Sequence, residues 1–158
     1  MDFMLHFGAP GLYGCGYVLM LLSALFPWVN GEAAMLALWA AAGPDTNLAL
    51  LAAVGTAGQM TGKCMLYWVA RRAASAPWPS LQRGLTRWRP RMSRRGAAVP
   101  ALMLASATFG IPPFYVTSVV AGALRIRFAT FASIGICGRL LHFGGLIWLP
   151  QLAVQYLS

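Results

Sequence analysis

The chain has 158 residues, of which 59% are hydrophobic and only 9% carry a charge. A soluble domain of this size usually has about a quarter of its residues charged, so this composition excludes an ordinary soluble protein and favours a single membrane domain, residues 1–158. The formal charge of +9 does not indicate a nucleic-acid-binding protein, because most of the basic residues lie between residues 71 and 95, in a segment that joins two apolar blocks.

The first apolar block, residues 12–42, is interrupted by a polar segment that contains Pro27, Asn30 and Gly31. Each half is shorter than the roughly 20 apolar residues that span a bilayer. A helix broken at membrane depth is tolerated only where its freed backbone groups are buried in protein or line a cavity. We therefore predict a re-entrant helical hairpin. An alternative stays open, because residues 12–26 would cover about 22 Å as a helix and, with their flanks, could span the membrane.

The second block, residues 48–70, has no such break, and its length predicts a transmembrane helix. It contains Gly58 and Gly62, a G-x-x-x-G step that favours close packing of another helix. A basic loop, residues 71–98, follows it. The positive-inside rule places this loop in the cytoplasm. A specific contact of its arginines with anionic lipid headgroups or with nucleic acid is the alternative role.

The third and fourth blocks repeat this order. Residues 99–124 are interrupted at Pro112 and Pro113 and predict a second re-entrant hairpin, and residues 128–149 are long enough to span. Interrupted apolar segments in corresponding positions of two halves point to a transporter-type binding site. The charge rule gives the two halves opposite orientations. We therefore predict an all-α integral membrane protein, multi-pass in the inner membrane, built from two inverted repeats that each comprise a re-entrant hairpin and a transmembrane helix.

Glu32 is the only acidic residue that this topology places at membrane depth, directly after the first kink. A carboxylate there can simply complement the positive end of a helix dipole. Ionisable residues at membrane depth nevertheless usually serve function, because burial without a partner is costly. We favour a functional Glu32 that exchanges a proton.

Arg139 and His142 stand three residues apart in the fourth block and therefore share a helix face. Arg139 lies too far from either end of the block to reach the interface easily, so it needs an anionic partner. That partner is either Glu32 or the phosphate of a substrate, which a guanidinium group binds with two parallel hydrogen bonds. His142 is either a packing residue or a further member of the site.

Lys63 completes the set of candidate transport residues, with Glu32, Arg139 and His142. It either extends along its helix to the cytoplasmic interface or points into the predicted cavity. The three cysteines lack metal-ligand spacing and are interpreted as small buried hydrophobic residues. The sequence holds no nucleophile triad, phosphate-binding loop or metal cluster, so we expect no cofactor and no enzymatic activity.

Three segments, in this order and spacing, resemble the DedA / SNARE-associated (VTT-domain) membrane protein family, and the chain is similar to its short bacterial-type members. They are a proline kink with its glutamate, a glycine-rich helix that ends in Tyr-Trp-x-x-Arg, and a Pro-Pro loop with the helix after it. These segments lie at residues 26–32, 55–71 and 112–122, the last followed by Gly138 and Arg139.

The resemblance implies two facing re-entrant hairpins and a role in lipid handling. Bacterial relatives flip undecaprenyl phosphate, some of them with suspected proton coupling, and eukaryotic relatives scramble phospholipids. It assigns functional roles to Glu32, Arg139 and the loop at Pro112. Two departures count against undecaprenyl phosphate and proton coupling. Lys63 stands where many relatives have an acid, and residues 106–109 lack an arginine that many relatives have there.

The sequence thus predicts a flippase or scramblase that moves a phosphate-bearing lipid, a phospholipid or a polyprenyl phosphate. Its partners would be membrane lipids and, given its small size and its relatives, a second copy of itself. Two other functions stay open. One is transport of a small ion or solute through the same cavity, and the other is a membrane scaffold without transport.

Overall fold

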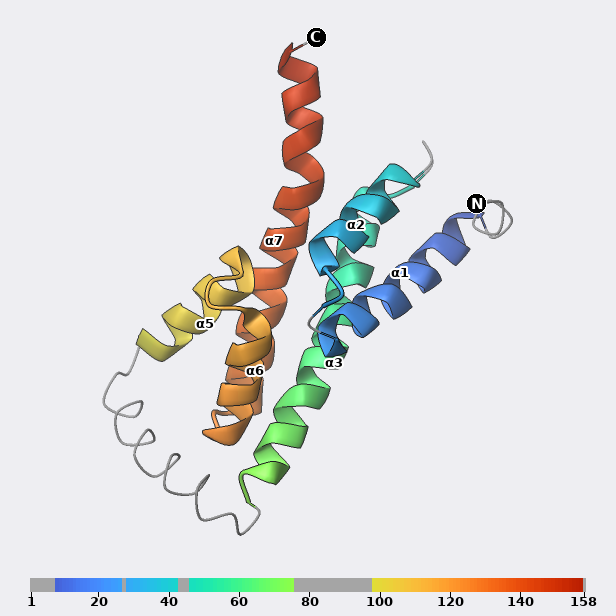
Figure 1. Ribbon diagram of the computed structural model, residues 1–158. Helices are drawn as coiled ribbons and strands as arrows, with labels where there is room; N and C mark the ends of the chain where they lie inside the picture. The colour runs from blue at the N-terminus through green and yellow to red at the C-terminus, as the bar shows by residue number, and fades with distance from the viewer. Residues whose placement is uncertain (1–7, 27, 43–45, 76–97, 158) are drawn as a thin grey trace. The chain divides into compact units, whose positions relative to one another are not determined.

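The computed structural model describes residues 8–26, 28–42, 46–75 and 98–157. Every regular element in these ranges is an α-helix, and they contain no strand, so the predicted all-α class is confirmed. Pro27 and residues 76–97 of the predicted basic loop lie outside the described residues. The helices (Figure 1) are α1 (Gly8–Leu25), α2 (Gly31–Ala40), α3 (Leu48–Ala73), α5 (Ala98–Phe109), α6 (Phe114–Ala123) and α7 (Phe128–Leu157).

One described helix is both long enough and apolar enough to cross a membrane, over Phe128–Trp148 of α7. The apolar stretches Pro10–Leu25, Ala98–Phe109 and Phe114–Ala123 are shorter. Helix α3 has 26 residues, about 39 Å at the rise of an α-helix, so it is long enough to cross a membrane. Its polar and basic residues make it less apolar than the stretch Phe128–Trp148, and it is not among the candidate spans. The number of membrane crossings therefore stays a prediction for the other helices.

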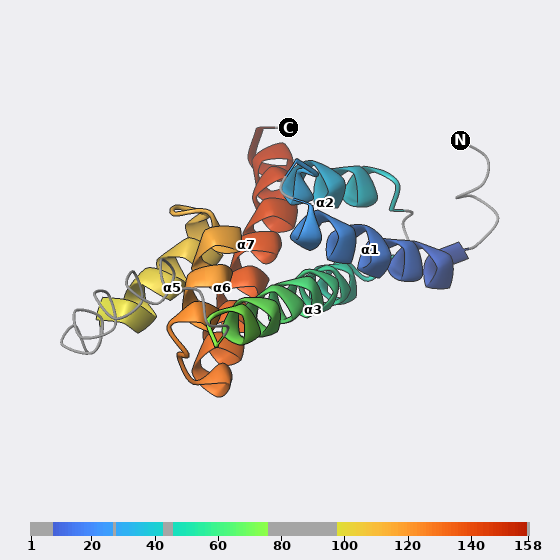
Figure 2. The same cartoon turned by 60° about the horizontal axis from the view of Figure 1, so that its bottom comes forward.

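Helices α1 and α2 form a hairpin whose two arms lie side by side (Figures 1 and 2). The break between them begins with a turn in which the Val29 amide donates to the carbonyl of Phe26 at 3.0 Å. It ends at Asn30, whose extended backbone precedes α2 and whose side chain caps that helix. An asparagine cap satisfies helix amides that would otherwise have no acceptor, so the chain can restart a helix here.

Helices α5 and α6 form the second hairpin, and their break is closed differently. Gly110 has φ +74°, a left-handed conformation that glycine adopts at little cost, and its amide donates to the carbonyl of Ser106. The Ser106 hydroxyl donates to the carbonyl of Pro112 at 2.6 Å and lies 2.7 Å from the hydroxyl of Thr117. Side chains of α5 and α6 thus hold the two arms together at the break.

Two helices continue beyond the apolar blocks that the sequence marks as long enough to span. Helix α3 continues from residue 70 to Ala73, with Arg71 and Arg72 in its last turn, where positive charge complements the helix dipole. Helix α7 does not end at residue 149 but continues to Leu157. The apolar span itself, Phe128–Trp148, agrees with the predicted block, and the helix continues beyond it because the residues after Pro150 are mostly good helix formers and include no glycine.

The helices divide between two compact units, which are described separately. The first comprises Met1–Gly62 and Arg139–Ser158, and the second comprises Lys63–Gly138. Each contains one hairpin, one part of α3 and one part of α7. The core of the first unit draws on all four of its helices, through Met20, Met35, Leu38, Leu51, Phe143 and Ile147.

The G-x-x-x-G step of α3 packs against α1 in the first unit. A Cβ atom at Gly58 would collide with the carbonyl oxygen of Tyr17, and one at Gly62 would lie 2.6 Å from the Cβ of Ala24. A missing side chain at both positions therefore allows the close approach of the two helices.

The core of the second unit is aromatic. The buried rings of Tyr67 and Phe131 stack at 5.0 Å between centroids, and the ring of Phe114 stacks on Phe131 at 6.0 Å. These residues come from α3, α7 and α6. Gly122 of α6 lies directly against the backbone of Tyr67, where a Cβ atom would have no room.

Candidate functional site

Several polar contacts meet at the start of α2 in the first unit. Asn30 Oδ1 accepts hydrogen bonds from the amides of Glu32 at 2.9 Å and Ala33 at 3.2 Å. Glu32 itself lies in the first turn, where its carboxylate complements the positive end of the helix. The kink thus fixes the backbone from which the Glu32 side chain extends.

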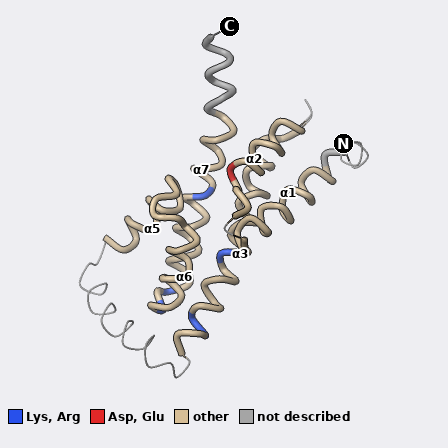
Figure 3. The backbone as a smooth tube through the Cα atoms, in the orientation of Figure 1, with Lys and Arg blue, Asp and Glu red and all other residues tan. Residues whose placement is uncertain are grey.

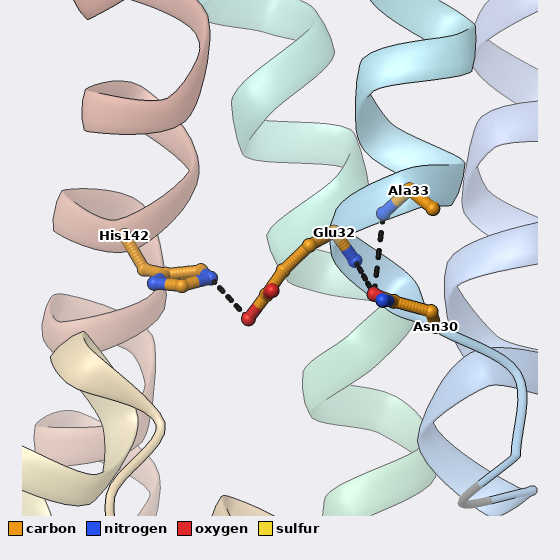
Figure 4. A network of polar contacts seen from close by, with 4 residues as sticks. All are labelled: Asn30, Glu32, Ala33 and His142. Carbon is orange, nitrogen blue, oxygen red and sulfur yellow. Dashed lines mark hydrogen bonds and ion pairs between the residues drawn. The ribbon is translucent and has the colours of Figure 1, made fainter.

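The Glu32 side chain reaches from α2 to α7, as Figure 4 shows. Its Oε1 atom lies 3.3 Å from Nε2 of His142. The imidazole is 14% exposed and the carboxylate 53% exposed. His142 is therefore a direct partner of Glu32 and not only a packing residue, a role that the sequence analysis left open.

Arg139 lies three residues before His142 and is 7% exposed. Its guanidinium group lies over the ring of Phe143 at 5.7 Å from the centroid, and it interacts electrostatically with Glu32. The structure thus brings together Glu32, Arg139 and His142, three of the four predicted transport residues. They form a group of one carboxylate and two basic side chains.

Gly31 is the point of closest approach at the first break. A Cβ atom there would lie 2.7 Å from Nε2 of Gln59 and 3.0 Å from the hydroxyl oxygen of Ser23. Both of these side chains are buried. Polar groups of α1 and α3 thus face the start of α2, and the sequence analysis missed both Ser23 and Gln59. Their polarity within apolar helices was the available signal.

Gln59 offers an unused acceptor. Its Oε1 atom is buried and has no hydrogen-bond partner among the described residues, and the same holds for the hydroxyl of Thr56, one turn away on α3. Buried polar atoms normally have a partner, so each such exception calls for an explanation. Gln59 can accept a hydrogen bond from water or from a hydroxyl or ammonium group of a substrate.

Lys63, the fourth predicted residue, belongs to the second unit and is only 4% exposed. Its Nζ atom lies 5.2 Å from the ring centroid of Tyr115, near the start of α6. The interpretation that Lys63 extends along the helix surface to the interface is wrong, because the side chain is enclosed by protein. It points instead toward the second break.

The start of α6 differs from the start of α2. Pro113 is the cap residue of α6, and no side chain caps this helix with a hydrogen bond. Helix α2 has both an asparagine cap and a carboxylate in its first turn. The start of α6 therefore retains the positive potential of an N-terminus, with Lys63 close by.

No group of three or more histidine, cysteine or acidic residues that could hold a metal occurs in the residues that the structure describes. The free cysteines Cys15 and Cys137 are exposed, which contradicts their interpretation as buried hydrophobic residues, and Cys64 is half-buried.

Comparisons with models of known protein families, with curated proteins and with solved structures give no match. The resemblance to the DedA / VTT-domain family therefore rests on the residues quoted above, and it enters the functional argument as a proposal.

Proposed function

We propose that this protein moves a phosphate-bearing lipid across the inner membrane, as a flippase or scramblase of the DedA / VTT-domain type. In this proposal the two broken hairpins are re-entrant, the inverted repeats bring their breaks to membrane depth, and the basic loop faces the cytoplasm. The chain acts as a transporter and not as an enzyme, and it forms a homodimer.

The start of α6 carries the proposal. A helix start without a side-chain cap and a buried lysine close to it provide positive potential, which favours a phosphate group. A charge at membrane depth is costly without a function. Lys63 and the amides of α6 would therefore hold the lipid phosphate while the acyl chains stay in the bilayer.

Glu32, His142 and Arg139 provide the second element of the proposed mechanism. Their mutual contacts compensate charges that would otherwise be costly in a membrane. A phosphate that pairs with Arg139 competes with Glu32 for this cation. Protonation of Glu32 would favour the phosphate, so headgroup capture and release would follow the protonation state of Glu32.

The decisive experiment is lipid movement by the purified chain in liposomes, with a fluorescent phospholipid and a polyprenyl phosphate tested separately. We expect movement of at least one lipid by the wild type and its loss in Glu32→Gln, Arg139→Ala and Lys63→Met. Asp45→Asn is the matched control, because it also removes a carboxylate, at a position that the sequence places outside the membrane helices. Wild-type flux in Glu32→Gln would reject the mechanism.

The two alternative functions give different results in the same liposomes. A small-ion or solute transporter gives substrate-dependent currents or uptake without lipid movement. A scaffold gives neither, and tolerates joint neutral replacement of Glu32 and Arg139. The Lys63→Met variant gives a further test of the lipid-transport proposal. If this variant loses lipid movement but keeps solute flux, the lipid phosphate is assigned to the start of α6.

A further inference from the structure

The end of α3 and the turn between α6 and α7 are tied together within the second unit. The Arg71 guanidinium donates to the hydroxyl of Tyr67 at 2.7 Å, and that hydroxyl donates to the carbonyl of Ile126. The Arg125 guanidinium donates to the hydroxyl of Ser75 at 2.6 Å. These bonds hold Arg71 and Arg125 at the end of the unit where α3 ends and α7 begins. We call the basic residues of these two segments the arginine end: Arg71, Arg72, Arg125 and Arg127. Figure 3 marks the backbone positions of lysine and arginine in blue.

Arg125 has a backbone conformation that disfavours any residue with a side chain. Its φ is +60°, and the amides of Arg125 and Ile126 donate to the carbonyls of Gly122 and Ala121 to close the end of α6. Glycine is the usual residue at this position of such a motif. An arginine held in a left-handed conformation points to a function for its side chain.

The positive charge of the arginine end has no acidic partner in its own unit. The sequence contains no aspartate or glutamate between residues 63 and 138. The guanidinium group of Arg71 lies over the rings of Trp68 and Tyr67, at 5.5 and 5.9 Å from their centroids, which fixes its position without neutralising it. An anionic ligand from outside the unit is therefore the complementary partner.

An exposed apolar strip of α3 leads up to these arginines. Met65, Trp68 and Val69 are 51%, 43% and 65% exposed, and Arg72 follows on the same helix face at the spacing i, i+3, i+4, i+7. The exposed ring of Phe128 from α7 widens the strip, at 5.5 Å from the ring of Trp68. A ligand that fits both parts has an anionic head and an apolar tail.

We propose that the arginine end binds an anionic phospholipid, with its phosphate between Arg72 and Arg125 and an acyl chain along the strip of Met65, Trp68 and Val69. This binding requires no lipid movement and is distinct from the transport proposed above. A nucleic acid would use the arginines but would leave the apolar strip uncovered, so the surface favours a lipid.

The test measures lipid contact at Trp68 in reconstituted vesicles. In the full chain the other five tryptophans are replaced by phenylalanine, and quenching by brominated phosphatidylglycerol is compared with quenching by brominated phosphatidylcholine. We expect phosphatidylglycerol to be preferred. Arg72→Gln with Arg125→Gln should remove most of this preference, about fivefold for each arginine contact. Arg83→Gln with Arg87→Gln removes the same amount of charge from two other arginines of the sequence and should leave the preference unchanged.

Three results would overturn the proposal. They are no preference for phosphatidylglycerol in the parent, an equal loss of preference in both double variants, and removal of the preference by excess inorganic phosphate at matched ionic strength. The last would identify a site for free anions. If the tryptophan replacements prevent folding, a second measurement is used. The phosphatidylglycerol that remains bound after detergent exchange is counted by mass spectrometry for the unmodified chain and the two double variants. We expect less of it only in Arg72→Gln with Arg125→Gln.

Discussion

The imidazole of His142 lies 3.3 Å from the carboxylate of Glu32, so a side chain near the C-terminal end of the chain contacts the start of α2. This contact joins α7 to the break of the first hairpin within one compact unit. It also places two titratable groups side by side at the point where the transport proposal needs a change of charge.

A double-mutant cycle on this pair measures its contribution to stability. We expect Glu32→Gln and His142→Asn to show a coupling of about 0.5–1 kcal/mol in thermal unfolding of the full chain in detergent, at the low end because the carboxylate is 53% exposed. The control cycle combines Glu32→Gln with Tyr13→Phe, whose hydroxyl bonds to Asn47 instead. Effects that add in the first cycle would contradict the contact.

Gly58→Ala should destabilise the protein by about 1–3 kcal/mol, because a new Cβ atom would meet the backbone carbonyl of Tyr17 and force α1 and α3 apart. Gly14→Ala is the matched control. A Cβ atom at Gly14 has nothing within 4 Å, so this substitution should be neutral or stabilise helix α1 by up to about 1 kcal/mol. The same unfolding measurement checks both, and equal midpoints for the two variants would refute the close packing.

Asn30→Ala should lower the free energy of unfolding by about 0.5–2 kcal/mol, because two amides of α2 lose their acceptor. Asn30→Ser should restore most of this loss, since serine is a comparable helix cap. Lipid movement should fall in Asn30→Ala as the position of Glu32 becomes less fixed. Full activity with an uncapped α2 would show that the cap does not position the carboxylate.

Ser106→Ala should cost about 1–3 kcal/mol, because it leaves the half-buried carbonyl of Pro112 and the buried hydroxyl of Thr117 without their shared partner. Ser133→Ala serves as the comparison. This exposed serine donates only to a carbonyl of its own helix, and its loss should change stability by less than about 0.5 kcal/mol. If Ser106→Ala proves as mild as Ser133→Ala in the unfolding midpoint, the serine does not hold the second break.

Local sequence was enough to locate the helices and their two breaks. Long apolar runs in α1, α5 and α6, interrupted by proline, glycine and asparagine, predict helices that stop and restart, since these residue types act on the backbone within a few positions. The same local signals marked the apolar span of α7 but not the end of the helix, because helix-forming residues after Pro150 continue it to Leu157.

Contacts between distant segments could not be read in this way. The sequence marked Glu32, Arg139, Lys63 and His142 as unusual because charge is costly in apolar surroundings, but it did not show that His142 contacts Glu32 or that Lys63 points toward Tyr115. In the sequence, Ser106 was noted only because residues 106–109 lack an arginine that many DedA / VTT-domain proteins have there. The structure shows that its hydroxyl bonds across the second break. The cost of burying a charge depends on the residue and on the apolar helix that carries it, so it can be recognised in the sequence. The partner that offsets this cost depends on how helices far apart in the chain pack together, so only the tertiary structure shows it.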